Sequence, residues 1–272
     1  KTRAAVDRGP GNSLMSDAVL AGFDRDTFSH DGKTRAVFSA GDGPGVIVIH
    51  EIPGITPEVS RFARWVVDAG FRVVMPSLFG VPGKPKSTGY LLSSFARACI
   101  SREFRCLAAN HASPVTEWLR ALCRGLHAEQ GGPGVGAIGM CLTGNFALSL
   151  MMEPAMMAPV LAQPSLPLPL GSARKKALHL SPEQLATAKS RDVPILGMRF
   201  DTDPACPPAR FDRLRDEFGA RFEAIEIPAR YAATSMRHSV LTNDLVDEAG
   251  HPTIAARDRV LSFLAERLKP SD

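Results

Sequence analysis

The stretch from Val135 to Leu148 contains the residues whose types and spacing most clearly indicate chemistry. It reads Val-Gly-Ala-Ile-Gly-Met-Cys-Leu-Thr-Gly-Asn-Phe-Ala-Leu, with Cys141 between Gly139 and Gly144. An apolar strand that turns sharply into a helix, with small residues around a nucleophile, is the nucleophile-elbow pattern, here with cysteine in place of serine. The N–H groups at the start of such a helix activate a thiol and stabilise an oxyanion. The alternative is a structural cysteine buried at a tight strand–helix turn.

Two further segments extend the pattern. One reads Gly-Val-Ile-Val-Ile-His-Glu-Ile-Pro-Gly-Ile over residues 45–55, and the other reads Ala-Gly-Phe-Arg-Val-Val-Met-Pro-Ser-Leu-Phe over residues 69–79. Together with the cysteine elbow they resemble the dienelactone hydrolase family, whose members share a strand ending in His-Glu-Ile-x-Gly and a strand ending in Pro-x-Leu-[Tyr/Phe]. The resemblance spans residues 23–268, and it implies an α/β-hydrolase fold with a mostly parallel central sheet and helices on both faces.

The resemblance also implies a catalytic triad. Cys141 would be the nucleophile, His238 its base and acid, and Asp203 the group that orients the imidazole. The chain order Cys, Asp, His agrees with this fold. Asp201 is an alternative to Asp203, which is preferred because its spacing to the following proline matches the family. His251 is an alternative to His238. His238 is preferred because it leaves the longer connection to the last helix that the family shows.

Glu51 is a further candidate, because the resemblance implies that it holds the cysteine and deprotonates it as substrate arrives. A buried carboxylate beside a thiol can share one proton with it. The alternative is a structural role in which Glu51 ties a loop. The backbone N–H groups of Leu142 and Ile52 would then form the oxyanion hole.

The sequence departs from the family pattern at two positions. Thr143 replaces the usual glycine of the elbow and makes that turn more crowded. Thr242 lies where the dienelactone-cleaving members look to have an arginine for the substrate carboxylate. Three arginines in the predicted cap over the pocket, residues 87–105, are candidate replacements, although a solvated helix face explains them as well. The candidate substrate-binding residues are therefore Arg97, Arg102, Arg105 and Thr242.

These residues need a scaffold, and the chain alternates short β-branched runs with longer helical patterns. That alternation predicts a mostly parallel sheet covered on both faces. The predicted strands are 35–39, 46–50, 72–75, 135–138, 157–162, 195–200 and 222–227. The predicted helices are 58–69, 94–108, 115–129, 142–152, 182–190, 207–218 and 254–269.

Length and composition fit one large domain. The chain has 272 residues, of which 44% are hydrophobic and 22% charged, and its net charge is +4. We expect a single α/β-hydrolase domain over residues 23–272 after a flexible leader at 1–22. The small net charge gives little support for nucleic-acid or membrane binding. Two uncharged runs, 130–152 and 154–173, are interrupted by glycines or prolines and are not predicted to span a membrane.

The remaining signals concern location and cofactors. Five cysteines, with no Cys-x-x-Cys pair, and no signal-like apolar run near the start favour a reducing, cytoplasmic location. No motif for a metal or a nucleotide is visible, so we expect a cofactor-free enzyme.

We therefore expect a hydrolase that cleaves an ester-type bond of a small molecule, a lactone or enol ester, through an acyl-thioester. A thioesterase or a general carboxylesterase is the nearest alternative. A non-catalytic α/β-hydrolase scaffold that binds a ligand or senses redox state through its thiol is the alternative from another class.

Overall fold

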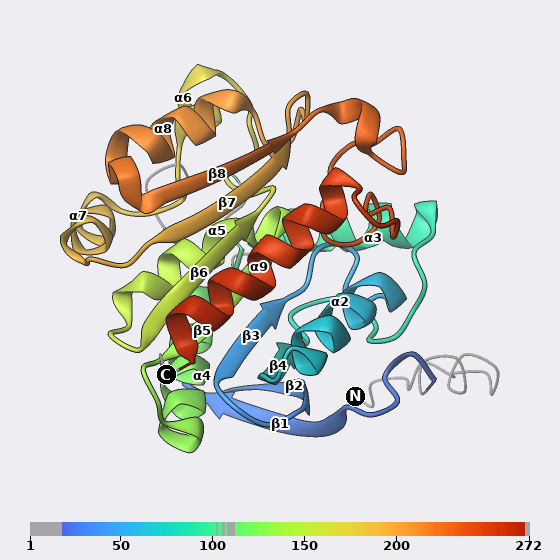
Figure 1. The fold of residues 1–272 in the computed structure, drawn as a ribbon, viewed down its shortest axis with the longest axis vertical. Coiled ribbons are helices and arrows are strands. Elements are labelled where there is room, and N and C mark those ends of the chain that lie inside the picture. Colours follow the sequence, from blue (N-terminus) through green and yellow to red (C-terminus); the bar gives the residue numbers. More distant parts are fainter. Residues whose placement is uncertain (1–17, 102, 105–106, 108–111, 270–272) are drawn as a thin grey trace, which may run out of the picture.

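One eight-stranded sheet forms the centre of the computed structural model, which describes all residues except 1–17, 102, 105–106, 108–111 and 270–272 (Figure 1). Its order is β1-β2-β4-β3-β5-β6-β7-β8. β2 runs antiparallel to both β1 and β4, and all other neighbours are parallel. The strands are β1 (Asp24–His30), β2 (Lys33–Ala40), β3 (Gly45–Ile49), β4 (Arg72–Pro76), β5 (Val135–Met140), β6 (Met156–Ala162), β7 (Ile195–Phe200) and β8 (Phe222–Ile227). The predicted mostly parallel sheet is confirmed.

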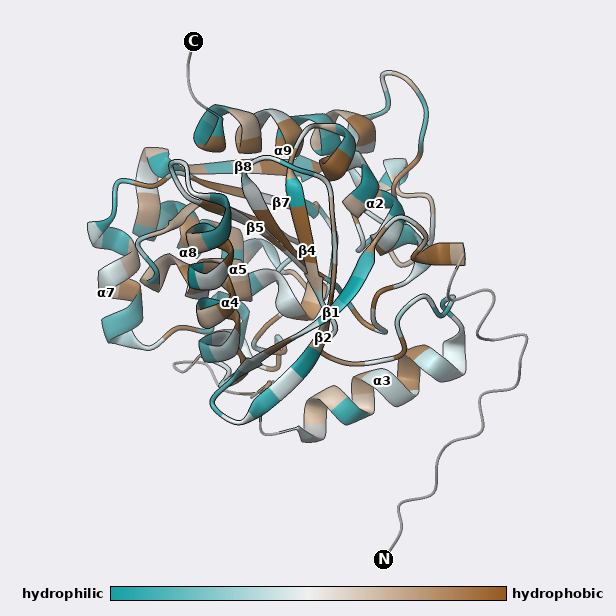
Figure 2. Ribbon diagram, turned by 90° about the horizontal axis from the view of Figure 1, so that it is seen from below, coloured by the Kyte–Doolittle hydropathy of each residue, from teal (hydrophilic) through white to brown (hydrophobic). Residues whose placement is uncertain are grey.

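Helices cover both faces of the sheet. The helices are α2 (Pro57–Asp68), α3 (Thr88–Ile100), α4 (Val115–Gln130), α5 (Gly144–Ser149), α6 (Ser172–Lys176), α7 (Pro182–Ser190), α8 (Pro208–Phe218) and α9 (Pro252–Leu268). Buried side chains of α2 and α9 pack into one core, and those of α4, α5 and α8 pack into a second core. α3 lies apart from the main helical layers, and the central strands are the most hydrophobic part of the ribbon (Figure 2).

The alternation of side chains along β3 explains the two cores. Val46 and Val48 belong to the core beneath α2 and α9, whereas Ile47 and Ile49 belong to the core on the opposite face. Successive side chains of a strand point to opposite faces, so an unbroken apolar run is expected where both faces are covered. Glu51 lies two residues beyond the end of β3. The buried strand therefore fixes the position of the backbone that leads into Glu51.

The predicted elements differ from the structure at several places. The helix predicted over 94–108 ends at Ile100, and the helix predicted over 142–152 consists of α5 between two single 3₁₀ turns, Cys141–Thr143 and Leu150–Met152. β1 was not predicted, because its polar sequence Asp-Arg-Asp-Thr-Phe-Ser-His is that of an exposed edge strand that pairs only with β2. The short helix α6 was also not predicted. α3 begins six residues before its predicted start, because the Ser87 side chain accepts a hydrogen bond from the Tyr90 N–H and caps the helix there.

The predicted leader, residues 1–22, lies mostly outside the described part, but its last residues contact α2. The Val19 carbonyl accepts hydrogen bonds from Ser60 Oγ and Arg64 Nη2, both at 2.7 Å. The last residues of the segment predicted as a leader are therefore attached to the domain. Within the described residues, no helix combines the length and the apolar character needed to cross a bilayer.

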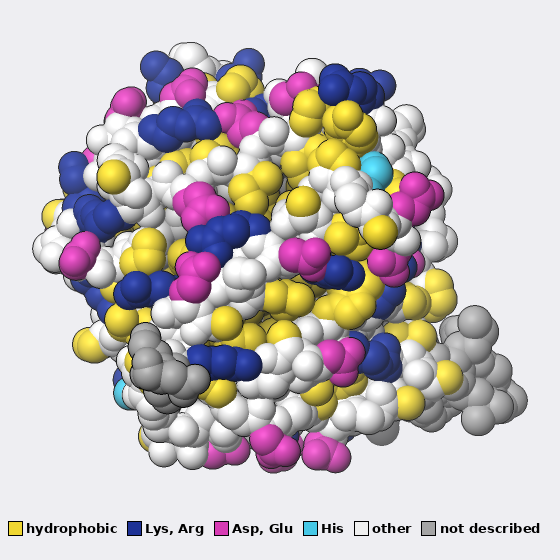
Figure 3. Space-filling model, viewed as in Figure 1, with side chains coloured by type: hydrophobic (Ala, Val, Ile, Leu, Met, Phe, Trp, Pro, Cys, Tyr) yellow, Lys and Arg dark blue, Asp and Glu magenta, His cyan; other side chains and the backbone are white. Residues whose placement is uncertain are grey.

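Charged side chains of both signs are interspersed over the face that carries α9 (Figure 3). Arg259 on α9 pairs with Glu223 at 2.7 Å and with Glu266 at 2.8 Å. Such pairing leaves the visible part of this face without a strong field of one sign.

Candidate active site

Cys141 occupies a strained turn between β5 and α5. Its φ is +55°, a left-handed conformation that residues with a side chain rarely adopt. A Cβ added at Gly139 would lie 2.3 Å from the Thr143 carbonyl oxygen, and one added at Gly144 would lie 2.5 Å from Pro164 Cα. The two glycines are therefore needed for the turn to close. Cys141 itself is half-buried and projects toward a pocket, as a nucleophile elbow requires.

Thr143 fastens this turn to the neighbouring strand. Its hydroxyl oxygen accepts the Met140 N–H at 3.1 Å, and its proton lies within reach of the carbonyl oxygens of Ile49 at 3.0 Å and His50 at 3.1 Å. The side chain is fully buried. A threonine in place of the usual glycine is thus accommodated, and it ties the end of β5 to the end of β3.

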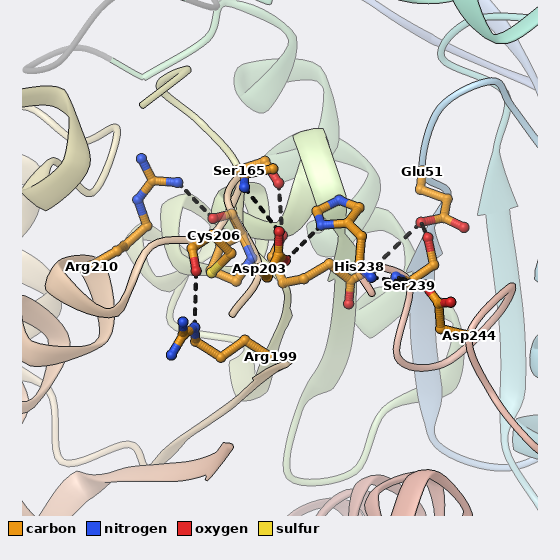
Figure 4. A network of polar contacts seen from close by, with 12 residues as sticks. Glu51, Ser165, Arg199, Asp203, Cys206, Arg210, His238, Ser239 and Asp244 are labelled. Carbon is orange, nitrogen blue, oxygen red and sulfur yellow. Dashed lines mark hydrogen bonds and ion pairs between the residues drawn. The ribbon is translucent and has the colours of Figure 1, made fainter. Parts of the chain in front are cut away.

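His238 and Asp203 form the next part of the site. His238 Nδ1 lies 2.6 Å from Asp203 Oδ2, and the aspartate also accepts the Ala205 N–H at 2.9 Å (Figure 4). Burial alone would lower the pKa of His238, but the charge on Cys141 and hydrogen bonds to Asp203 and Cys141 raise it well above its usual value. The imidazole is therefore held between the carboxylate and the thiol.

The two alternative residues lie elsewhere. Asp201 is exposed, and its carboxylate accepts the Ala229 N–H at 3.0 Å. His251 caps the start of α9, where its ring accepts the Thr253 N–H. The structure therefore brings together Cys141, Asp203 and His238, the preferred set.

Glu51 follows the end of β3 and lines the same pocket, as predicted. It is only 1% exposed, and both of its carboxylate oxygens are hydrogen bonded. Oε2 accepts from Ser239 Oγ at 2.8 Å and from Gln163 Nε2 at 3.4 Å. Oε1 accepts from Thr242 Oγ1 at 2.5 Å and from Asn243 Nδ2 at 3.0 Å. Three of these four donors belong to the segment that follows His238.

The predicted substrate-binding residues need correction. Thr242 is 1% exposed and gives its hydroxyl proton to Glu51, so it supports the site from behind instead of facing substrate. Arg97 lies on the exposed side of α3 and is not part of the described pocket lining, which favours the alternative of a solvated helix face. Arg102 and Arg105 lie outside the described residues.

The pocket has a volume of about 230 Å³. Residues from the ends of three strands meet α3 and the His238 loop around it. The lining residues are Glu51, Ile52, Lys86, Leu91, Leu92, Phe95, Cys141, Asp203, Pro204, Ala205, Met236, His238, Ser239 and Asp244. The prediction that the α3 region caps the pocket is confirmed for Leu91, Leu92 and Phe95.

The two residues predicted to form the oxyanion hole lie close to the nucleophile in sequence or line the pocket. Ile52 is one of the lining residues, and Leu142 directly follows the nucleophile in a single turn of 3₁₀ helix, Cys141–Thr143. The backbone N–H groups of both remain a prediction for this role.

His50, which precedes Glu51, has a structural role. Its Nε2 accepts the Leu78 N–H at 3.0 Å, so its Nδ1 carries the proton and donates to the Glu51 carbonyl oxygen at 3.0 Å. Burial lowers the pKa of His50 to about 4. This histidine is therefore neutral and links the loop after β4 to the loop that carries Glu51.

The sequence did not indicate the role of two buried arginines that hold the loops of the candidate site. Arg199, in β7, donates to the carbonyl oxygens of Asp201 at 2.6 Å and Cys206 at 2.9 Å, and so brackets the turn that carries Asp203 (Figure 4). Arg210 donates to the carbonyl oxygen of Pro164 at 2.6 Å. The one available signal was Arg199 itself, a charged residue inside an otherwise apolar strand.

The fold and this site define the class of the protein. A mostly parallel sheet whose fifth strand ends in a nucleophile elbow is an α/β-hydrolase. The sequence profile of the dienelactone hydrolase family matches residues 33–245, so the chain belongs to the dienelactone hydrolase family of carboxylic ester hydrolases.

Solved structures agree with this fold. A candidate dienelactone hydrolase from Klebsiella pneumoniae subsp. pneumoniae is similar over 90% of this chain and 98% of its own, with a TM-score of 0.64 and 17% identity. A dienelactone hydrolase from Anabaena variabilis is similar over 91% and 98%, with a TM-score of 0.59 and 14% identity. A thioesterase domain from the curacin biosynthetic pathway is similar over 90% and 99%, with a TM-score of 0.52 and 14% identity. No curated protein sequence shows significant similarity to the chain.

Proposed function

We propose that the protein hydrolyses an ester-type bond of a small molecule, a lactone or enol ester, with Cys141, His238 and Asp203 as its catalytic triad. The observation that carries this proposal is the position of the His238 imidazole, whose Nδ1 is hydrogen bonded to Asp203 Oδ2 and which lines the same pocket as Cys141. A nucleophile within reach of a base that is itself oriented by a third group is the arrangement that nucleophilic catalysis needs.

The chemistry proceeds in two halves. The Cys141 sulfur attacks the ester carbonyl carbon, and the N–H groups of Leu142 and Ile52 stabilise the oxyanion. When the carbon–oxygen bond breaks, the leaving oxygen takes the proton from His238, and an acyl-thioester remains on Cys141. His238 then takes a proton from water, whose oxygen attacks the thioester. The carbon–sulfur bond breaks and the acid leaves. Cys141 is then a thiolate beside a protonated His238, which is the state from which the reaction began.

Glu51 supports this triad as a positioning residue. The resemblance implied that it accepts the thiol proton, but each of its oxygens already accepts two hydrogen bonds. A proton from Cys141 would have to displace one of these bonds. The donors Ser239, Thr242 and Asn243 follow His238 closely in the chain, so the carboxylate fixes the loop that carries the imidazole.

A hydrolysis screen with matched cysteine variants tests the proposal. Lactones, enol esters, aryl esters and acyl thioesters are offered to the wild type, to Cys141→Ala and to Cys99→Ala. We expect hydrolysis in the wild type and in Cys99→Ala, none in Cys141→Ala, and an acyl adduct on Cys141 in rapidly quenched samples analysed by mass spectrometry. Unchanged turnover in Cys141→Ala would show that the nucleophile is wrong.

The screen also separates the alternatives. A marked preference for thioesters over oxygen esters with the same acyl group would favour a thioesterase. No hydrolysis of any compound by a folded protein would favour the ligand-binding or thiol-sensing scaffold.

A further inference from the structure

The pocket has one wall that is markedly apolar. Leu91, Leu92 and Phe95 lie on one side of α3, at positions i, i+1 and i+4, and Met236 comes from the loop just before His238. These four side chains face the space in front of Cys141. They are contributed by two segments that are far apart in sequence.

These side chains are unusually exposed for their type. Leu92 is 63% exposed, Phe95 40% and Met236 54%. They are three of the six large hydrophobic residues that are strongly exposed in the described part of the chain, and they gather at the mouth of one pocket. A cluster of exposed apolar side chains around a pocket marks a binding surface, because leaving such area in water costs free energy.

The carboxylates of the pocket already have partners within the protein. Glu51 is held by four donors, Asp203 by His238 and Ala205, and Asp244 by the N–H groups of the His238 loop. Lys86 is the single Lys or Arg among the described lining residues. A carboxylate on the substrate would therefore find no arginine among these residues to form a bidentate ion pair. An apolar group would instead pack against the four apolar side chains.

The size of the cavity limits the occupant. At about 230 Å³ it is smaller than the roughly 300–1,000 Å³ of sites that bind drug-sized ligands. Only a short chain or a single ring fits beside the reacting carbonyl.

We propose that the substrates are small uncharged esters that carry one short apolar group, and that Leu92, Phe95 and Met236 select them by packing against that group. The apolar group belongs to the acyl half or to the alcohol half of the ester, and the two share the same chemistry of recognition. This inference rests on the proposed hydrolase function and specifies its substrate class.

An ester series tests the selection. The 4-nitrophenyl esters of acetic, butanoic, hexanoic and decanoic acid vary the acyl half, and the acetates of ethanol, butanol and hexanol vary the alcohol half. Burying a methylene changes kcat/KM by up to about fourfold. We expect one of the two series to gain about tenfold or more by the six-carbon member and then to level off or fall as the cavity fills. The 4-nitrophenyl hemisuccinate, which ends in a carboxylate, should be about tenfold poorer than the butanoate.

Variants assign the effect to the apolar wall. Leu92→Ala combined with Phe95→Ala should reduce the chain-length preference in kcat/KM to about threefold or less. The matched control is Leu170→Ala, which truncates a leucine that is 59% exposed away from this pocket. The control should keep the wild-type preference. The same preference in the double variant and in the wild type would overturn the proposal, as would flat rates in both series.

A second measurement works without hydrolysis and so separates this proposal from the proposed function. Cys141 is alkylated with N-methylmaleimide and with N-hexylmaleimide, and each rate is divided by the rate of that reagent with glutathione. We expect the hexyl reagent to be favoured by about tenfold in the wild type and not in the double variant. If no ester is hydrolysed but this preference is present, the hydrolase proposal fails and the apolar pocket stands. Equal normalised rates would overturn the pocket proposal.

Discussion

The carboxylate of Asp244 accepts the backbone N–H groups of His238 at 2.8 Å and Ser239 at 2.9 Å. Its other oxygen accepts the Thr234 N–H at 2.8 Å, and the whole side chain is 1% exposed. Asp244, which belongs to the loop that carries the imidazole, therefore joins distant residues of that loop. Glu51, which follows β3, attaches the same loop to the sheet. Because both ends of the loop are fixed, Asp203 needs only to set the orientation of the ring.

The charge on His238 should persist to higher pH than that of an ordinary histidine. Burial opposes this, but the charge on Cys141 and the hydrogen bonds to Asp203 and Cys141 raise its pKa. The stabilisation from this charge is full below the unfolded value of about 6.5 and is lost as pH rises through the folded pKa. Nuclear magnetic resonance of labelled histidine should show the raised midpoint in the wild type.

Variants of the neighbours should lower that midpoint. Asp203→Asn and Cys141→Ala each weaken or remove interactions that raise the pKa of His238, and Asp203→Asn should also reduce kcat by about 10³–10⁴-fold. Asp201→Asn is the control and should leave the titration of His238 unchanged. A His238 midpoint that does not move in Asp203→Asn would contradict the assigned hydrogen bond.

Thr143 should contribute to stability through its hydroxyl group. Thr143→Val keeps the volume but leaves the Met140 N–H without its acceptor and removes a donor to the carbonyl oxygens of Ile49 and His50. A buried group without its partner costs about 1–3 kcal/mol. We expect a loss of that size in the free energy of unfolding from urea titrations. Thr187→Val, in the exposed part of α7, should change it by less than about 0.5 kcal/mol.

His50 should make the fold sensitive to acid. Burial lowers its pKa to about 4, whereas an unfolded histidine takes up its proton near 6.5. The folded state is therefore favoured above pH 6.5, and this contribution is lost as pH falls toward 4, by up to about 3 kcal/mol.

The difference between the wild type and His50→Gln isolates this effect. The unfolding free energy of the variant should be lower at pH 7 and should depend less on pH between 6.5 and 4. Parallel pH profiles for the two proteins would show that His50 does not titrate on unfolding.

The sequence predicted the fold and the grouping of the three candidate triad residues because their signals are local. The elbow glycines, the apolar strands and the spacing around Asp203 and His238 each depend on a few adjacent residues, and the structure places them as expected. The edge strand β1 was not predicted because its sequence is polar and has no apolar alternation. It forms a strand only by pairing with β2.

The supporting contacts could not be predicted in the same way. Glu51 and Thr242 are 191 positions apart, and Arg210 and Pro164 are 46 positions apart. Such pairs meet only after the strands are assembled, so no spacing in the sequence records them. For the same reason Thr242 was assigned to substrate and not to Glu51. The pocket wall was predicted only as a segment, because which side of α3 faces Cys141 depends on how the helix docks.

The last prediction separates the two roles of Glu51. Glu51→Gln replaces one carboxylate oxygen by an amide N–H₂ group, which cannot accept hydrogen bonds. The side chain would then lose either the bonds from Ser239 and Gln163 or the bonds from Thr242 and Asn243. As a positioning residue, Glu51 should therefore lower kcat by about 10²-fold when changed to Gln, with a smaller change in KM.

The decisive comparison is the double variant Thr242→Val with Asn243→Ala, which removes two donors and keeps the carboxylate. If Glu51 acts by holding the loop, this variant should also lose kcat, by about tenfold or more, and the resonance of the His238 ring should shift. If Glu51 is instead the base for Cys141, the double variant should keep kcat, because a carboxylate with fewer donors accepts a proton more readily. In that case Glu51→Gln alone should slow turnover while making the resting thiol react faster with iodoacetamide.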